Sequence, residues 1–382
     1  MLNGVDLLAR HALAEQIRED SWEAQLSIGV QAHPEPGERC RVDTEPMRLG
    51  STRVARSFSL YQSRGAGSGS ASESASGSAS GSADCLDPVG SVLVGLGASV
   101  ADSVVTGLTG EGCHLTLLEV VPAVEFAQAG AGGQARLSYG IHIEGEVSAE
   151  QARRAVRAAR ERSSGHRTLE DPNEIRVVVQ TEQDVHLTGR PAAAGTDPFA
   201  PARRHTARVA WEVGAHVIAE VDGVRAESDQ PKQLFGADVA PSAQEYFLSA
   251  LAAEALRFAA PAGRAPSPTA DADPSPAQDA VHASGRIDLR GPYSALDAPA
   301  GLRNILVQLL PADPSAGSDG GAAGPAEAMR GWLAEGDSLR LVRDAHPIRV
   351  EVVLNGTPIP ADPDEPLPHT EMNDTKEQHR AP

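Results

Sequence analysis

The sequence predicts an α+β fold made of two similar halves, each with strands on either side of one long apolar helix. Three observations predict it. Segments that alternate apolar and polar residues, as half-buried strands do, recur along the chain. Each half has one long helix that is apolar on nearly all sides, which favours a buried position. The order of strands, apolar helix, strands, helix and strand occurs twice, which indicates an internal repeat.

The elements of the first half follow from local signals. After an amphipathic helix within residues 1–16, the apolar helix has Pro88 in its first turn and Asp87 as a plausible N-cap. Strand-like alternation brackets it on both sides, and a charged helix precedes the last strand. The expected ranges are strands at 22–33 and 51–62, the apolar helix at 88–108, strands at 114–127 and 134–146, a helix at 148–162 and a strand at 174–181.

The second half repeats this order after a linker at 190–203. Its expected ranges are strands at 204–213 and 216–221, an apolar helix at 241–260, strands at 281–290 and 302–310, a helix at 325–335 and a strand at 347–354. The domains are therefore predicted as 1–189 and 204–357. Segments rich in Gly, Ser, Ala, Pro or Asp at 65–84, 261–280 and 358–382 are expected to lack regular structure.

The composition excludes several classes of partner. The chain has 33 Lys and Arg against 52 Asp and Glu, a net charge of −19, and such a surface repels phosphate backbones and anionic lipid. We therefore expect no nucleic acid and no membrane partner, and a cytoplasmic protein. The three cysteines, Cys40, Cys85 and Cys113, are too few for a disulfide framework and fit no zinc motif. The histidines show no metal-ligand spacing, and those in or beside strands, His205 among them, are expected to face solvent. No metal and no cofactor are predicted.

A specific motif lies in the second half. The run 229–254, DQPKQLFGADVAPSAQEYFLSALAAE, resembles the central-helix signature of the OsmC and organic-hydroperoxide-resistance family. The segments 284–291 (SGRIDLRG) and 338–350 (SLRLVRDAHPIRV) are similar to later family patterns. The first half matches by spacing at 3–8 (NGVDLL), 87–99 (DPVGSVLVGLGAS) and 162–172 (RSSGHRTLEDP). Because family members are intertwined homodimers with two central helices at the interface, the resemblance implies that one chain supplies both copies. It implies an α+β single-chain pseudodimer, each half an antiparallel sheet wrapped around a central helix.

The resemblance also implies which chemistry is missing. The family reduces peroxides with one cysteine in the central helix and a second one near a later helix. Those positions are Ser99 and Ser163 or Ser164 in the first half, and Glu254 and Ser338 in the second. A serine hydroxyl has no accessible sulfenic state, so a thiol peroxide cycle cannot run there. The family's activating Glu is matched by Glu245 in the second half and by Gly90 in the first, and its Arg is not placed.

Two functions are open. The first is a degenerate family member that binds a small molecule in the cleft between the halves, or acts as an accessory protein, as a monomeric pseudodimer or a higher homo-oligomer. The candidate ligand-binding residues are Ser99, Glu245, Glu254, Ser338 and His166. The alternative is an enzyme, either a peroxidase with a relocated thiol at Cys85 or Cys113, or new chemistry that uses Ser99, Glu245 and Glu254.

Each candidate also has a plainer interpretation. One interpretation combines Ser99, His166 and an acid such as Glu254 as nucleophile, base and orienting group. Alternatively, Ser99 merely fills the volume of the cysteine. Glu254 stands on an apolar face, so it binds a cationic group, takes part in catalysis, or is held by a structural partner.

Overall fold

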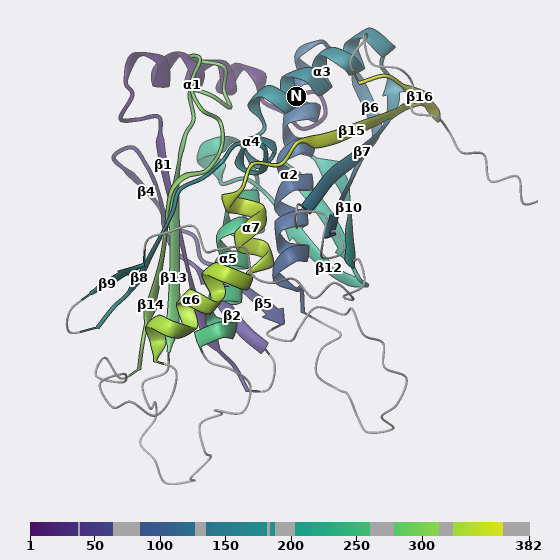
Figure 1. Cartoon of the computed structure of the whole chain (residues 1–382). Helices are drawn as coiled ribbons and strands as arrows, with labels where there is room; N and C mark the ends of the chain where they lie inside the picture. Colours follow the sequence, from purple (N-terminus) through teal and green to yellow (C-terminus); the bar gives the residue numbers. More distant parts are fainter. Residues whose placement is uncertain are drawn as a thin grey trace, which may run out of the picture.

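A computed structural model describes residues 1–36, 39–63, 85–126, 135–181, 184–187, 203–259, 279–312 and 324–361 (Figure 1). The segment 65–84, the linker 190–203 except Arg203, and most of 261–280 and 358–382 lie outside the described residues. Arg203 begins a strand, and residues 357–359 belong to another, so ordered structure extends slightly into the predicted linker and tail.

The described residues form an α+β structure with seven α-helices and two mixed sheets. The helices are α1 (Leu7–Glu19), α2 (Pro88–Gly110), α3 (Ala149–Arg162), α4 (Ser164–Glu170), α5 (Ala243–Ala259), α6 (Pro325–Glu335) and α7 (Asp337–Arg343), with a 3-10 turn η1 (Lys232–Leu234). The long helices and strands agree with the predicted ranges to within a few residues, whereas α4 and α7 were not predicted.

Each sheet takes strands from both halves of the chain. The first sheet contains β1 (Gln25–Pro34), β2 (Arg39–Thr44), β3 (Met47–Leu49), β4 (Thr52–Val54), β5 (Ser59–Ser63), β8 (Ile175–Val179), β9 (Val185–Leu187), β13 (Ala280–Asp288) and β14 (Arg303–Leu310). The second contains β6 (His114–Phe126), β7 (Ala135–Glu146), β10 (Arg203–Val213), β11 (His216–Val221), β12 (Val224–Ser228), β15 (Ile348–Leu354) and β16 (Thr357–Ile359). The single strand predicted at 51–62 is in fact two short strands, β4 and β5.

The two sheets share one pairing scheme. In the first, β1 pairs with β13, β13 with β14, β14 with β8 and β8 with β9; in the second, β10 pairs with β6, β6 with β7, β7 with β15 and β15 with β16. The third pairing in each series is parallel and the others are antiparallel. The prediction of purely antiparallel sheets is therefore wrong. Because β8 and β15 each follow a helix instead of a hairpin turn, they can enter the sheet parallel to their neighbours.

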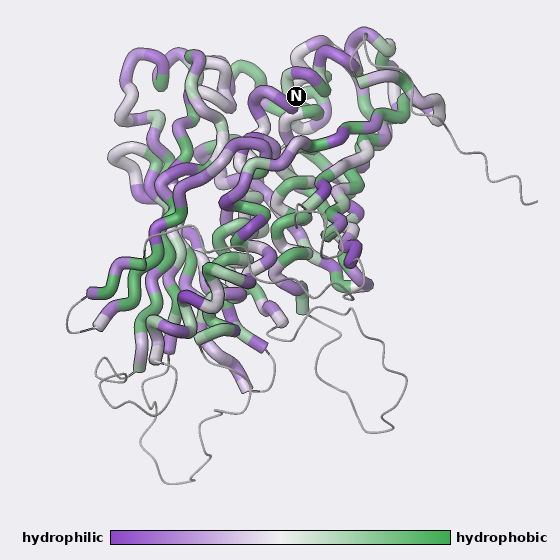
Figure 2. The backbone as a smooth tube through the Cα atoms, viewed as in Figure 1, coloured by the Kyte–Doolittle hydropathy of each residue, from purple (hydrophilic) through white to green (hydrophobic). Residues whose placement is uncertain are grey.

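The two apolar helices pack against each other, and each also packs on strands of one sheet (Figure 1). Hydrophobic segments follow this helix pair and the surrounding strands in Figure 2. The helices approach closely at Gly95, where an added Cβ would lie 2.7 Å from the carbonyl oxygen of Ala243. By length and composition α2 could cross a membrane, but most of this helix is buried inside the protein.

Candidate functional site

Three serines meet where α2 passes the start of α4. The hydroxyl oxygen of Ser99 lies 2.9 Å from that of Ser163 and 3.1 Å from that of Ser164. Gln244, from α5, donates its side-chain N–H to the hydroxyl of Ser164. All four side chains are buried. We call Ser99, Ser163 and Ser164 the serine cluster. The family resemblance assigns one cysteine position to Ser99 and the other to Ser163 or Ser164.

The serine cluster accepts hydrogen bonds from the first turn of α4. The backbone N–H of Gly165 donates to the Ser99 hydroxyl at 2.8 Å, and that of His166 donates to the Ser163 hydroxyl at 3.3 Å. Ser163 is the N-cap of α4, so two of the orphan donors of this helix start are satisfied by serine oxygens. A Cβ on Gly165 would lie 2.8 Å from the Ser99 Cβ, and glycine permits this approach.

In the second half, Glu254 accepts hydrogen bonds from the start of α7, as the serine cluster does from the start of α4. Its carboxylate accepts the backbone N–H groups of Ser338 (3.0 Å) and Leu339 (3.1 Å), and the indole N–H of Trp332 (2.9 Å). The N-cap of α7 is Gly336, which has no side chain to accept a bond. Glu254 is buried near Ser338, with 2% of its surface exposed. Burial raises the pKa of Glu254, and the hydrogen bonds from Ser338 and Trp332 act in the opposite direction.

Ser338 takes part through its backbone alone. Its hydroxyl has no hydrogen-bond partner among the described residues. Glu254 likewise has no described hydrogen bond to Glu245 or to the first half. These contacts favour the structural interpretation of Glu254, because its acceptor oxygens already hold three donors.

Glu245 pairs with an arginine that sequence reasoning did not place. Arg56, which lies between β4 and β5, approaches the Glu245 carboxylate to 3.4 Å and Asp238 to 3.3 Å, and both Arg56 and Glu245 are buried. The Glu245 carboxylate also accepts the backbone N–H of Ser242 at 2.6 Å. Burial raises the pKa of Glu245, while the charge of Arg56 opposes that shift. Because this pair joins residues 189 positions apart, no local pattern could reveal it.

His166 lies apart from the serine hydroxyls. The Tyr139 hydroxyl is 2.9 Å from Nδ1 of His166, and Nε2 of His166 is 3.3 Å from Glu170. Burial, helped by Arg160 and Arg167, lowers the pKa of His166 to about 3, so the imidazole is neutral at pH 7. Among the described residues, no hydrogen bond joins Ser99 to the side chain of His166 or to Glu254. The structure therefore does not assemble Ser99, His166 and Glu254 as nucleophile, base and acid.

A cavity of about 350 Å³ opens beside the serine cluster, between α1, α2, α3 and residues of the second half. Its polar lining includes Arg10, Ser99, Asp102, Ser103, Ser164 and Gln244. Arg10 pairs with Asp102 at 2.8 Å and stacks over the Tyr293 ring. The remaining wall is largely apolar, with Leu26 and Ile287 among its residues. A larger cleft of about 1030 Å³, beside β8 and the connection from α7 to β15, contains none of the predicted site residues.

The three thiols are poorly placed for redox work. Cys40, Cys85 and Cys113 are all buried, and none forms a disulfide. Burial, with Glu111 nearby, raises the pKa of Cys113, which disfavours the reactive thiolate.

One histidine differs from its prediction. His205 on β10 is buried, with 8% of it exposed, instead of facing solvent, whereas His142 and His186 are exposed as expected. The side chain of His205 points inward toward the start of α2, beside Asp87.

A search against protein-family models gives no match for this chain, and no curated protein matches it.

Proposed function

We propose that this chain is an OsmC-like single-chain pseudodimer that has lost thiol peroxidase chemistry and binds a small molecule in the cavity beside Ser99. The serine cluster and the carboxylate of Glu254 then act as helix caps, one in each half. We propose no ligand site beside Glu254 in the second half, because the Trp332 side chain lies against its carboxylate and donates a hydrogen bond to it.

The strand pairings support the pseudodimer. The same series of four pairings occurs in both sheets, and in each the parallel partner comes from the opposite half. Two subunits that exchange strands across a twofold axis would give this scheme. The close packing of α2 on α5 agrees with two central helices at the interface.

Equivalent contacts in the two halves support the proposal that serine and glutamate side chains stand where the family has its cysteines. Ser99 reaches Ser163 and Ser164, and Glu254 reaches the backbone of Ser338. In both halves the central helix thus touches the start of the later short helix, as a peroxidatic and a resolving cysteine would need to do. The groups that meet are hydroxyls, a carboxylate and N–H donors, which cannot be oxidised to a disulfide.

The cavity is the observation that carries the binding function. A volume of about 350 Å³ lies within the range of small-molecule sites. The lining combines apolar residues with polar ones, Arg10, Ser99 and Gln244 among them, and such polar groups orient a ligand within an apolar site.

Ligand-observed NMR with a set of small amides, alcohols and carboxylic acids tests this function. We expect at least one class to bind the wild-type chain and to lose binding in Ser103→Phe, whose ring would fill the cavity. Ser51→Phe, on an exposed surface, is the matched control and should bind as the wild type does. Fragments that bind Ser103→Phe equally well, or that do not bind the wild type, would contradict the proposal.

A further inference from the structure

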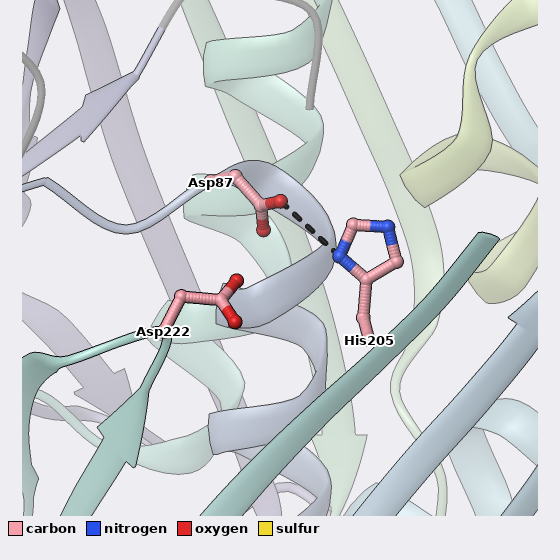
Figure 3. A group of neighbouring side chains, drawn as sticks. All are labelled: Asp87, His205 and Asp222. Atoms are coloured by element: carbon pink, nitrogen blue, oxygen red, sulfur yellow. Dashed lines mark ion pairs between the residues drawn. The ribbon is translucent and has the colours of Figure 1, made fainter. Parts of the chain in front are cut away.

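A group of three metal-ligating side chains lies at the other end of α2 from the cavity. Asp87 is the N-cap of α2, His205 lies on β10, and Asp222 lies in the turn between β11 and β12 (Figure 3). One ligand atom from each residue lies within 4.8 Å of the other two. Asp87 is twelve residues before Ser99, or about 18 Å along the helix, so this group is distinct from the serine cluster.

The surrounding structure holds the three side chains in place. One oxygen of Asp87 accepts the backbone N–H of Gly90, which leaves the other oxygen turned toward His205. A Cβ on Gly90 would lie 2.9 Å from both the Asp87 carboxylate and Val221, so glycine lets the end of β11 approach the helix start. The His205 ring packs edge-on against Phe126, with ring centroids 6.0 Å apart. Two ligands are therefore fixed before any ion binds.

The third ligand provides the opening. Asp222 is exposed and has a φ of 49°, followed by Gly223 at 81°, which is the backbone of a tight hairpin turn. The group is thus buried on the side of His205 and open to solvent at Asp222. An ion can enter from that side and keep one position for water.

The charges and distances suit a divalent ion. Nδ1 of His205 lies 3.3 Å from the Asp87 carboxylate, and two ligands of a tetrahedral zinc ion lie roughly 3.3 Å apart, given bonds of about 2.0–2.1 Å. A protonated imidazole would offset one carboxylate and leave a negative charge, whereas a divalent ion with neutral His205 offsets both. Arg203, two residues earlier on the strand, is already paired with Asp337 at 2.5 Å.

We propose that Asp87, His205 and Asp222 form a binding site for one Zn²⁺ ion, with an open coordination position toward solvent. One imidazole and two carboxylates are donors that zinc accepts, and three protein ligands with a free fourth position are typical of non-structural zinc sites. The sequence did not predict this site, because Asp87 lies more than a hundred residues before His205 and Asp222 and the three show no motif spacing.

Isothermal titration of the metal-free full-length chain with Zn²⁺ tests the proposal, with the visible spectrum of bound Co²⁺ as a second readout. We expect one equivalent to bind, and Asp222→Asn and His205→Gln each to weaken that binding at least tenfold. Asparagine tolerates a positive φ, so Asp222→Asn should keep the turn and the fold. Unchanged thermal unfolding of the metal-free variant would establish that it does.

His216→Gln is the matched control. His216 lies on the neighbouring strand β11 and has one carboxylate partner, Glu227, at the same distance of 3.3 Å, and it belongs to no three-ligand group among the residues that the structure describes. This variant should bind Zn²⁺ as tightly as the wild type. Equal affinity in the wild type and Asp222→Asn, or a loss in His216→Gln as large as in His205→Gln, would overturn the site. Neither result bears on binding in the cavity beside Ser99.

Discussion

At the residue scale, Ser99 on α2 and Glu254 on α5 have the same task, because each accepts hydrogen bonds from backbone N–H groups at the start of a short helix. The Ser99 hydroxyl accepts one N–H from the start of α4, and the Glu254 carboxylate accepts two from the start of α7. A buried carboxylate is costly unless donors surround it. Glu254 meets that condition with three N–H donors, which oppose the effect of burial on its carboxylate.

Glu254→Gln should lower the free energy of unfolding by about 2 kcal/mol, because an amide NH₂ would face N–H donors and leave at least one of them unpaired. Urea unfolding at pH 7 measures this. The control is Glu335→Gln, an exposed residue on α6, which should change stability by less than about 0.5 kcal/mol. Equal stability of the two variants would mean that the carboxylate does not stabilise the start of α7.

His166 should make stability depend on pH. Its pKa is lowered to about 3 in the folded chain against about 6.5 when unfolded, so the unfolded chain takes up the proton first as the pH falls. Its contribution is present above pH 6.5 and is lost toward pH 3. The stability of the wild type relative to His166→Gln should therefore fall by about 2 kcal/mol between pH 7 and pH 5. A difference that stays constant across this range would contradict a neutral, buried His166.

At the scale of elements, the two shortest helices depend on distant residues. The helices α4 and α7 have seven residues each, too few to be stable alone. Each receives acceptors from the central helix of its own half. Trp332 and Gly336 pack tightly around the Glu254 carboxylate at the start of α7. A Cβ on Gly336 would lie 2.7 Å from Glu254 and 2.8 Å from Trp332.

Gly336→Ala should destabilise the fold by about 1–3 kcal/mol, because the new methyl group must displace Glu254 or Trp332. Gly110→Ala is its control. Gly110 ends α2 with nothing within 4 Å of an added Cβ, so alanine there should cost nothing or stabilise slightly. Thermal unfolding of both variants measures the contrast. A Gly336→Ala chain as stable as Gly110→Ala would show that the close approach imposes no constraint.

The sequence predicts elements well where their pattern is long and local. The thirteen-residue strand β6 and the start of α2 at Pro88, with its Asp87 cap, were found to within a residue. The helices α4 and α7 were missed because their stability comes from Ser99 and Glu254, many residues away. Arg56 was missed for the same reason, since only the folded chain places it beside Glu245. The family resemblance did single out Ser99 with Ser163 or Ser164, and Glu254 with Ser338, as paired positions, and the structure brings each pair together.

At the scale of the whole molecule, the two halves depend on each other for their sheets. The strand β1 of the first half pairs with β13 of the second, and β10 of the second pairs with β6 of the first. The central helices bury their apolar faces against each other and the two sheets. Neither half therefore has a complete sheet or a covered core by itself.

Separate fragments 1–195 and 196–382 should lack a cooperative thermal transition, and an equimolar mixture should regain one, because exposed strand edges and apolar helix faces find their partners only together. Circular dichroism during heating measures this. A cooperative transition in either fragment alone would mean that the halves are independent domains.

Thiol-dependent consumption of an organic hydroperoxide by the purified wild-type chain tests the central claim most directly. The account predicts that turnover with dithiothreitol equals that of the same protein with its thiols blocked. The positions that the family resemblance assigns to cysteines hold other residues, namely Ser99, Ser163 or Ser164, Glu254 and Ser338. The three cysteines that the chain does have, Cys40, Cys85 and Cys113, are buried. Robust turnover that disappears in Cys85→Ser or Cys113→Ser would contradict the account, because a relocated thiol would then carry the chemistry.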